Sequence, residues 1–281
     1  DRPRSHTLDF CGRSRVFWFG SRAEQLPDTG VPGSRDRVLQ KTSILGLVSS
    51  IPEPDVSVLV PALNEEATIA EVVQRLLALP LQLEVIVIND GSRDRTGEIL
   101  SEFGEKIRLI TNATPGGKGS AIRSGLSAAT GKVVVIQDAD LEYSPCEIPS
   151  LVQPILDGKA DVVYGSRFLH GMHAGMAWPN KIVNRLLAAA VRILFRVKLS
   201  DEATCYKAFR RDILLDMDLN CTRFEFCPEV TAKAIRMGHK IVELPISYEP
   251  RTKNAGKKIR WTDAPDAFWT LWRYRSWRPR R

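Results

Sequence analysis

The sequence predicts an α/β protein: a doubly wound, mostly parallel sheet with helices on both faces, formed by a single domain. Two observations lead to this prediction. Short continuous runs of Val and Ile recur from residue 56 onward, as is typical of strands buried on both faces of a parallel sheet. Amphipathic segments of about ten to fifteen residues separate these runs, as the crossover helices of βαβ units require. The 281 residues, 43% hydrophobic and 26% charged, suffice for a sizeable core.

The elements follow one another along the chain. Each Val/Ile run is predicted as a strand, and each segment with apolar residues three or four positions apart is predicted as a helix. After residue 165 the alternation becomes less regular, but no repeat or low-complexity linker marks a second domain. The predicted strands are 56–60, 85–88, 107–110, 133–136, 205–209 and 240–245, and the predicted helices are 65–79, 96–103, 118–129, 181–197, 228–237 and 264–274.

Composition divides the chain into three stretches. Residues 1–54 hold several Pro, Gly and Ser without regular apolar spacing, so we expect a poorly ordered N-terminal extension. The folded domain is expected over residues 55–260. Residues 261–281 are rich in Trp and Arg and are expected to form a basic C-terminal helix and tail.

No apolar run approaches the roughly 20 residues that a membrane-spanning helix needs, so membrane contact is expected to be peripheral. The five cysteines are odd in number, lie far apart and include no C-x-x-C pair, which favours reduced thiols. We therefore expect a cytoplasmic protein, either free or held peripherally at the cytoplasmic face of a membrane.

Positive charge is concentrated near the C-terminus. Residues 251–281 hold ten Lys and Arg against two Asp, so the other 250 residues contribute −1 to the total of +7. Such a segment points to an anionic partner: substrate phosphates, lipid headgroups or nucleic acid. On a helix, Trp261, Phe268 and Trp272 would form an aromatic stripe. This stripe either contacts an anionic membrane or packs on the domain.

Carboxylates follow the predicted strand at 133–136. Asp138 and Asp140 lie two residues apart in an extended segment, so their side chains point the same way, and Glu142 continues the series. Like charges this close need a cation between them, and oxygen ligands suit Mg²⁺ or Mn²⁺. The segment therefore predicts a divalent-metal site, with a solvated acidic turn as the alternative.

Other polar residues follow neighbouring strands. Pro61, Leu63 and Glu65 come at the end of the first predicted strand, and Asp90 follows the second. Ligands of doubly wound folds bind at the carboxyl ends of the strands, so these residues are expected at one edge of the sheet. Asp90 can accept hydrogen bonds from a nucleotide base or ribose, or it can act only as a turn residue.

A glycine-rich segment at residues 115–120 leads into a predicted helix and resembles a phosphate-binding loop. It does not match the P-loop pattern, and no G-x-G-x-x-G follows the first strand. ATPases and nicotinamide-dependent enzymes therefore lack their sequence fingerprints here. The sequence has no G-x-S-x-G segment and only four histidines, so a hydrolase triad is poorly supported.

Four motifs in this order resemble those of the family-two inverting glycosyltransferases with the GT-A fold, and more narrowly the dolichol-phosphate or polyprenol-phosphate sugar synthase branch. The resemblance covers about three quarters of the chain, residues 56–263. It implies metal-dependent transfer of a sugar from a nucleoside-diphosphate sugar to a polyprenyl phosphate. The motifs are Pro61-Ala62-Leu63-Asn64-Glu65, Asn89-Asp90-Gly91-Ser92-Arg93-Asp94-Arg95-Thr96, Gly117-Lys118-Gly119 and Asp138-Ala139-Asp140-Leu141-Glu142.

The resemblance also implies roles for individual residues. Asp90 would recognise the base, and Glu142 stands where that branch usually has Gln. Arg167 precedes the acceptor loop. By this resemblance donor binding is expected for Pro61, Leu63, Glu65, Asp90, Lys118, Gly119, Asp138, Arg167, Lys207 and Lys258, metal binding for Asp138, Asp140 and Glu142, and catalytic roles for Asp140, Asp201, Arg251 and Lys257. Glu229 is added to the catalytic residues only as a candidate general base.

The acceptor decides whether a general base is needed. A lipid phosphate is already anionic at neutral pH and needs none. A hydroxyl of a glycan, glycolipid or small soluble acceptor would need a carboxylate to take its proton, and the candidates are Asp201 and Glu229. Glu229 lies near a predicted helix start, where it can equally be only a favourable charge. A non-catalytic nucleotide- or nucleic-acid-binding protein is a third interpretation, against which the paired carboxylates argue.

Overall fold

The computed structural model describes residues 54–169, 176, 178–251 and 264–279, and the expected N-terminal extension lies outside this range apart from Pro54. All the predicted strands and helices overlap observed elements. The strands are β1 (Val56–Ala62), β2 (Leu83–Asn89), β3 (Arg108–Thr111), β4 (Val133–Ile136), β5 (Val162–Ser166), β6 (Lys207–Arg210) and β7 (Ile241–Pro245). The helices are α1 (Ile69–Leu77), α2 (Thr96–Ser101), α3 (Lys118–Ala128), α4 (Ile148–Leu156), α5 (Trp178–Phe195), α6 (Arg211–Asp216), α7 (Phe226–Arg236) and α8 (Ala264–Tyr274), with short 3₁₀ turns η1 (Gly104–Lys106) and η2 (Pro145–Glu147).

The described strands form one seven-stranded sheet of order β3-β2-β1-β4-β6-β5-β7. β1 pairs in parallel with both β2 and β4, β2 pairs in parallel with β3, and β5 pairs in parallel with β7. β6 runs antiparallel between β4 and β5. The prediction of a mostly parallel sheet is therefore confirmed, and it places the carboxyl ends of β1, β2 and β4 at the same edge.

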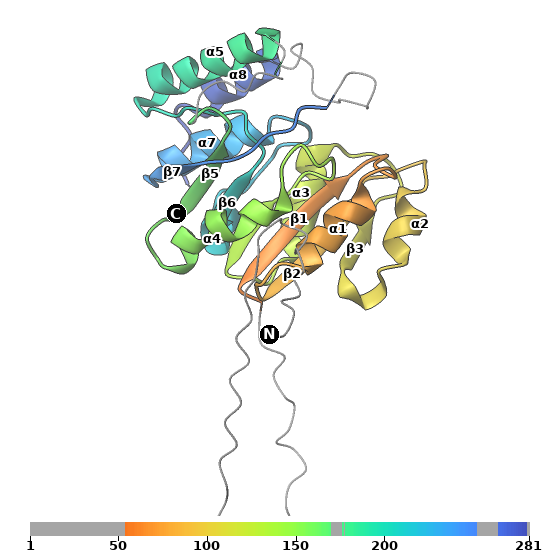
Figure 1. Cartoon of the computed structure of the whole chain (residues 1–281). Coiled ribbons are helices and arrows are strands. Elements are labelled where there is room, and N and C mark those ends of the chain that lie inside the picture. Colours follow the sequence, from red (N-terminus) through yellow and green to blue (C-terminus); the bar gives the residue numbers. More distant parts are fainter. Residues whose placement is uncertain (1–53, 170–175, 177, 252–263, 280–281) are drawn as a thin grey trace, which may run out of the picture. The chain divides into compact units, whose positions relative to one another are not determined.

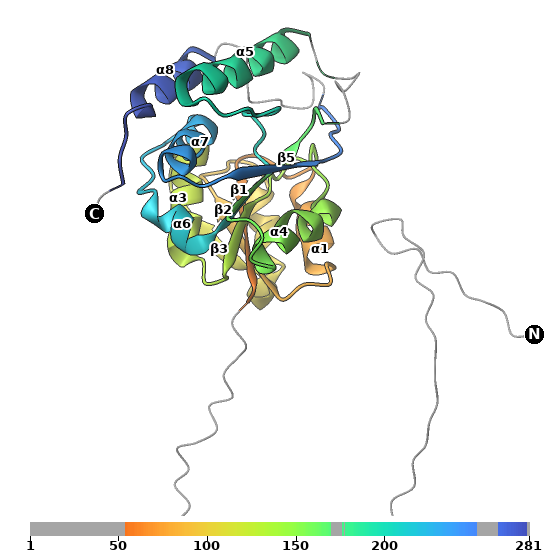
Figure 2. The same ribbon diagram turned by 90° about the vertical axis from the view of Figure 1, so that its left-hand side faces the viewer.

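Helices cover both faces of the sheet, as predicted (Figure 1, Figure 2). In Figure 2, α3 and α6 lie on one side of the strands and α1 and α4 on the other. α5 and α8 pack against each other, and in both views they lie together beyond the sheet. None of the described helices combines the length and the apolar character needed to cross a membrane.

Three elements were not predicted from the sequence: α4, β5 and α6. α4 has Pro149 in its first turn and Pro154 inside it, and proline removes a backbone donor that a helix normally uses. β5 is completed by pairing with β6 and β7, which lie 40 residues or more further along the chain. Its strand character depends on those distant partners.

The C-terminal helix has the predicted bounds and packs on α5 and α7, with Leu271 and Tyr274 buried. The predicted aromatic stripe is divided by this packing. Phe268 packs partly buried against the core, Trp272 is exposed, and Trp261 lies outside the described residues. The exposed aromatic pair on this helix is Trp269 with Trp272, whose rings stack at 4.9 Å between centroids.

The cysteines do not all match the sequence-based expectation. Cys205, Cys221 and Cys227 are free and buried. Cys146 is disulfide-bonded, so the expectation of reduced thiols is wrong for this residue. The argument for a cytoplasmic location that rested on reduced thiols loses part of its support.

Gly125 should be indispensable for the packing of α3 on the sheet. A Cβ at this position would lie 2.7 Å from Ile88 Cδ1 and 3.2 Å from Leu59 Cδ2, both in the core. Gly125→Val should therefore lower the free energy of unfolding by about 1–3 kcal/mol, measured by urea unfolding, because the core has no room for the added atoms. Ser127→Val, at an exposed position of the same helix, is the matched control and should change it by less than about 0.5 kcal/mol. Equal losses in the two variants would show that packing at Gly125 is loose.

Candidate active site

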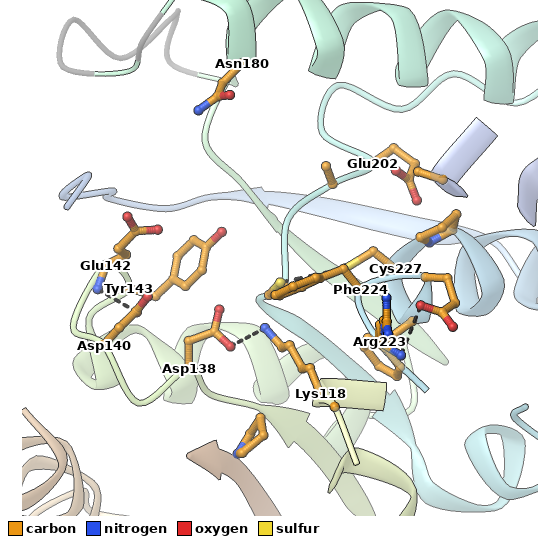
Figure 3. Close-up of a pocket in the computed structure, with 18 of the residues that line it drawn as sticks. Lys118, Asp138, Asp140, Glu142, Tyr143, Asn180, Glu202, Arg223, Phe224 and Cys227 are labelled. Carbon is orange, nitrogen blue, oxygen red and sulfur yellow. Dashed lines mark hydrogen bonds and ion pairs between the residues drawn. The ribbon is translucent and has the colours of Figure 1, made fainter. Parts of the chain in front are cut away.

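A pocket of about 480 Å³ opens at the carboxyl edge of the sheet. Its walls come from the ends of β1, β2 and β4, the start of α3, and residues of α5 and α8. Side chains from elements far apart in sequence therefore meet in one volume, as Figure 3 shows. The predicted site residues that line it are Pro61, Leu63, Glu65, Asp90, Lys118, Asp138, Asp140, Glu142, Arg167 and Arg251.

The predicted metal carboxylates lie together after β4. Asp138 forms an ion pair with Lys118, and the backbone N–H of Glu142 donates to Asp140 Oδ1 at 3.1 Å (Figure 3). Burial, and then the negative charges of Asp138 and Glu142, raise the pKa of Asp140 to about 7. Burial alone would lower the pKa of Lys118, but the Asp138 carboxylate raises it well above its ordinary value. The cluster is thus a place where a further positive charge would be stabilised.

Glu142 is engaged by protein groups. Its Oε1 accepts the backbone N–H of Arg251 at 2.8 Å, and its Oε2 accepts the Tyr248 hydroxyl at 3.1 Å. Among the described residues, no three His, Cys, Asp or Glu side chains form a ready-made metal cage. A metal at this site would therefore need oxygen atoms of a bound substrate in addition to protein carboxylates.

Arg251 connects the end of β1 to the carboxylate segment. Its guanidinium lies 2.8 Å from Glu65 Oε2, donates to Thr68 Oγ1 at 3.0 Å, and donates through Nε to the Asp140 carbonyl at 2.9 Å. One cation therefore holds two sides of the pocket together. Lys257 and Lys258, predicted to act with it, lie outside the described residues.

Asp90 organises the glycine-rich loop. Its carboxylate accepts the backbone N–H of Gly117 at 2.7 Å, that of Gly116 at 3.0 Å, and the Asn112 side-chain amide at 2.8 Å. The carboxylate thereby holds the loop in place beside Lys118 and the pocket.

The start of α3 is closed off by the 221–223 segment. The N–H groups of Gly119 and Ser120 donate to the carbonyls of Arg223 and Thr222, both at 3.0 Å. A Cβ at Gly119 would lie 2.8 Å from the Cys221 carbonyl carbon, so glycine permits this close approach. Together with the two amides bound to Asp90, these N–H groups are already used. The resemblance to a phosphate-binding loop therefore does not extend to free amides.

Arg167 and Asp201 form a buried bidentate pair. Arg167 Nε and Nη2 donate to the two carboxylate oxygens of Asp201, both at 2.7 Å. The Arg167 guanidinium also lies 5.2 Å from the centroid of the Tyr248 ring. Asp201 is fully buried and is not among the pocket-lining residues. From there the Asp201 carboxylate fixes the orientation of Arg167, which lines the pocket.

Lys207 and Glu229 also lie outside the pocket lining. Lys207 is buried, donates to the Glu202 carbonyl at 2.9 Å, and packs over the Tyr164 ring. Glu229 pairs with buried Lys233 at 2.6 Å and accepts the backbone N–H groups of residues 220 and 221. This geometry favours the structural alternative for Glu229, and the structure does not bring Lys207 to the donor pocket.

Several pocket residues were missed by the sequence analysis. The Tyr143 ring lies against the Tyr248 ring in a tilted arrangement, with centroids 5.7 Å apart, and its signal was its place directly after Glu142. Asn180 and Asn184 face the pocket from one side of α5, and their four-residue spacing was the available signal. Glu202 had no such signal. Both of its carboxylate oxygens are buried without a hydrogen-bond partner in the described part of the chain, and burial raises its pKa.

Removing the charge of Asp140 should stabilise the protein when no divalent ion is present. Its pKa rises from 3.8 to about 7 on folding, so the folded state binds the proton more tightly and loses stability as the pH rises from about 4 to 7. Asp140→Asn should thus raise the free energy of unfolding by about 4 kcal/mol at pH 8 and change it little at pH 4, measured by urea unfolding in EDTA. Exposed Asp216→Asn is the control. An equal gain at both pH values would contradict the charge explanation.

Comparison with known proteins shows which family the chain belongs to. The sequence model described as "Glycosyl transferase family 2" matches residues 57–217. The dolichol-phosphate mannosyltransferase of Pyrococcus furiosus is 29% identical over 212 residues, which are 72% of this chain and 58% of that protein. The low-salt glycan biosynthesis hexosyltransferase Agl6 of Haloferax volcanii is 30% identical over 72% of this chain and 49% of its own length. The chain thus spans about half the length of these two relatives.

In two further comparisons the match covers most of the other protein's length. An uncharacterized glycosyltransferase of Mycobacterium tuberculosis is 32% identical over 204 residues, 72% of this chain and 88% of that protein. The crystal structure of glucosyl-3-phosphoglycerate synthase from the same organism, in complex with uridine diphosphate, has a TM-score of 0.63 at 23% identity and covers 81% of this chain and 82% of that one. At this identity the structural likeness shows the fold alone. The chain belongs to glycosyl transferase family 2, and it is a glycosyltransferase with the GT-A fold.

Proposed function

We propose that this glycosyltransferase moves a sugar from a nucleoside-diphosphate sugar to a polyprenyl phosphate, with inversion at the anomeric carbon. The observation that carries the proposal is the grouping of Asp138, Asp140 and Lys118 in one pocket at the carboxyl end of β4. Similarity to a dolichol-phosphate mannosyltransferase supports the acceptor class. The choice of nucleotide and sugar is left open by these residues.

The carboxylate cluster fits a divalent cation. Asp138 and Asp140 offer only oxygen ligands, which suits Mg²⁺ or Mn²⁺. The pKa of Asp140 is raised by burial first and then by the negative charges of Asp138 and Glu142, which a cation would balance. These two residues would hold the ion together with the donor diphosphate, with Glu142 beside them. A bound ion would act as a Lewis acid that stabilises the departing diphosphate. Crystal structures of glucosyl-3-phosphoglycerate synthase with UDP and Mn²⁺ or Mg²⁺ support divalent-metal use in this fold.

The protein's own cations would complete the charge balance. Arg251 lies at the pocket beside the Asp140 backbone and would stabilise negative charge that develops on the leaving group. Lys257 and Lys258 are proposed to act with it, from the family resemblance alone. Asp90 would position the loop against the base of the donor, with Pro61 and Leu63 at the adjacent strand end.

The two carboxylates considered as general bases are both held in ion pairs, which supports a phosphate acceptor. Asp201 is bound by Arg167 and Glu229 is bound by Lys233, so neither carboxylate is placed to take a proton from a substrate. An acceptor that is already anionic needs no such base.

One observation favours a second candidate, transfer to a hydroxyl of a glycan or a small soluble acceptor. Glu202 lines the pocket, and both of its carboxylate oxygens lack hydrogen-bond partners within the described residues. Figure 3 shows it across the pocket from Asp140. A carboxylate in that position could accept the proton of a hydroxyl group. Radiolabelled donors offered with either a polyprenyl phosphate or a soluble glycan would separate the two candidates.

Asp140→Ala should reduce transfer by about 100-fold or more, because it removes an interaction that stabilises the leaving group. It should also abolish the rise in Tm that Mn²⁺ and a nucleoside diphosphate produce together, while the circular dichroism spectrum stays unchanged. Asp216→Ala, at an exposed position, is the control and should behave like the wild type. Full activity of Asp140→Ala in EDTA-treated buffer would contradict the metal assignment.

We further propose that the acceptor is met at an anionic membrane surface, which the protein contacts through the outer faces of α5 and α8. This outer face consists of exposed apolar side chains on two packed helices, with Trp178 at 71% and Ile193 at 76% exposure. On α5 the apolar residues recur at helical spacing opposite buried Leu187. The face is formed by Trp178, Ile182, Leu186, Ile193, Trp269 and Trp272.

Charge supports a lipid partner for this face. Residues 178–198 hold five Lys and Arg and no Asp or Glu, and Arg273, Arg275 and Arg278 follow on and after α8. Apolar and Trp side chains flanked by arginine are typical of segments that lie in the interface of anionic membranes. The opposite side of α5 lines the pocket, so docking would bring the pocket to the headgroups that present a polyprenyl phosphate.

The double variant Ile193→Glu/Trp269→Glu should weaken sedimentation with phosphatidylserine vesicles at low salt by about tenfold or more, since burying one such side chain contributes about 1.5–3 kcal/mol. Nucleotide-induced thermal stabilisation should be unchanged. Leu215→Glu, 44% exposed on α6, is the control and should bind like the wild type. Equal binding to neutral vesicles, or no effect of the double variant, would contradict this docking surface and favour a soluble acceptor.

A further inference from the structure

Two free cysteines meet in the lining of the pocket. Cys205 is separated from the first residue of β6 by Tyr206 alone, and Cys227 is the second residue of α7. Their Sγ atoms lie 3.8 Å apart, and the residues are only 4% and 7% exposed, yet both line the pocket. The proposed transfer reaction uses neither of them. They are 22 positions apart in the sequence, so only the folded chain brings them together.

The surroundings make the two thiols unequal. The hydrogen-bond contact with Cys227 and the nearby Lys118 ammonium lower the pKa of Cys205, although burial and the Asp138 carboxylate oppose them. The same contact and burial raise the pKa of Cys227, whose Sγ–H can donate to the Thr204 carbonyl at 3.3 Å. A thiol that ionises more readily beside one that keeps its proton is the arrangement found in reactive cysteine pairs.

We infer that Cys205 and Cys227 form a redox modification site, which a peroxide converts to a disulfide and a thiol reductant restores. The Cys205 thiolate attacks one peroxide oxygen, the O–O bond breaks, and sulfenic acid and hydroxide form. The Cys227 sulfur then displaces the sulfenic oxygen, which leaves as water with its own hydrogen and the proton that Cys227 gives up. The proton that Cys205 lost on ionisation converts the hydroxide to the second water. In sum, two thiols and one hydrogen peroxide give one disulfide and two waters.

Closing this bond would alter the pocket. A disulfide holds its sulfurs about 2.05 Å apart with a defined torsion, so closing the 3.8 Å gap must turn the two side chains and strain the start of α7 against the segment before β6. Arg223 and Phe224 lie just before α7 and also line the pocket, so their positions would change with it. Oxidation is therefore expected to weaken nucleotide binding, an effect that does not depend on which acceptor the enzyme uses.

Cys221 provides an internal comparison. It is also free and buried, but it does not line the pocket, and burial raises its pKa well above the ordinary value. A thiol of that kind should resist peroxide. Trypsin places the three cysteines on separate peptides, 199–207, 212–223 and 224–233, so each can be followed by itself.

The experiment treats the reduced full-length chain with graded hydrogen peroxide, blocks remaining thiols with iodoacetamide in denaturant, and maps the tryptic peptides without reductant. The expected product is peptide 199–207 joined to peptide 224–233, two hydrogens lighter than the sum and released by dithiothreitol, while Cys221 stays alkylated. Cys205→Ser and Cys227→Ser should each abolish the product, and Cys221→Ser should leave it unchanged. Alkylation of Cys205 and Cys227 at peroxide levels that oxidise Cys221 would overturn the inference.

A second measurement tests the consequence for the pocket. The oxidised protein should lose most of the thermal shift that UDP and Mn²⁺ give the reduced protein, and dithiothreitol should restore it. Cys205→Ser should keep its shift after peroxide. A full shift in the disulfide-bonded protein would overturn the inferred effect on binding. If the disulfide forms but the reduced protein shows no nucleotide shift at all, the redox site stands and the donor-pocket proposal fails.

Discussion

The parallel pairing of β1 with β2 and β4 is the constraint on which the rest of the structure depends. These strands consist mostly of buried Val, Ile and Leu, so their position in the middle of the sheet follows from the hydrophobic effect. Parallel neighbours end at the same edge. Glu65, Asp90 and Asp138 are therefore brought together by the burial of residues that have no chemical role themselves.

The strand ends bring acidic side chains together, and their negative charges repel one another. Among the described residues, eight Asp and Glu side chains line the pocket, including Glu65, Asp138, Asp140 and Glu142. Four Lys and Arg side chains balance only part of their charge. Burial, and then the charges of Asp138 and Glu142, raise the pKa of Asp140, so its ionised form is disfavoured in this cluster. A site that costs the empty protein stability is typical of one built to bind a cation and phosphates. The same imbalance explains why the pocket suits a nucleotide donor held through a divalent ion.

Buried polar groups outside the pocket hold its walls in position. Glu229 binds the backbone at 220–221, which in turn packs on the start of α3. Glu243 of β7 accepts the backbone N–H groups of Ser200 and Asp201, next to the pair that orients Arg167. Each carboxylate satisfies backbone amides that would otherwise be buried without partners, which would cost about 1–3 kcal/mol apiece. Glu229 and Glu243 therefore position the loops around the pocket rather than line it.

The sequence by itself determined the order of most strands and helices, the mostly parallel character of the sheet, and the carboxylates after β4, because hydrophobic spacing and strand-end residues are local signals. Helix 264–274 and strand 133–136 needed no tertiary information for their bounds. Only the tertiary structure decided that Glu229, Asp201 and Lys207 are buried away from the pocket, and that Glu202, Cys205 and Cys227 line it. The physical reason is that a charged or thiol side chain takes its role from the groups packed around it, and those come from strands and helices that are distant in the chain.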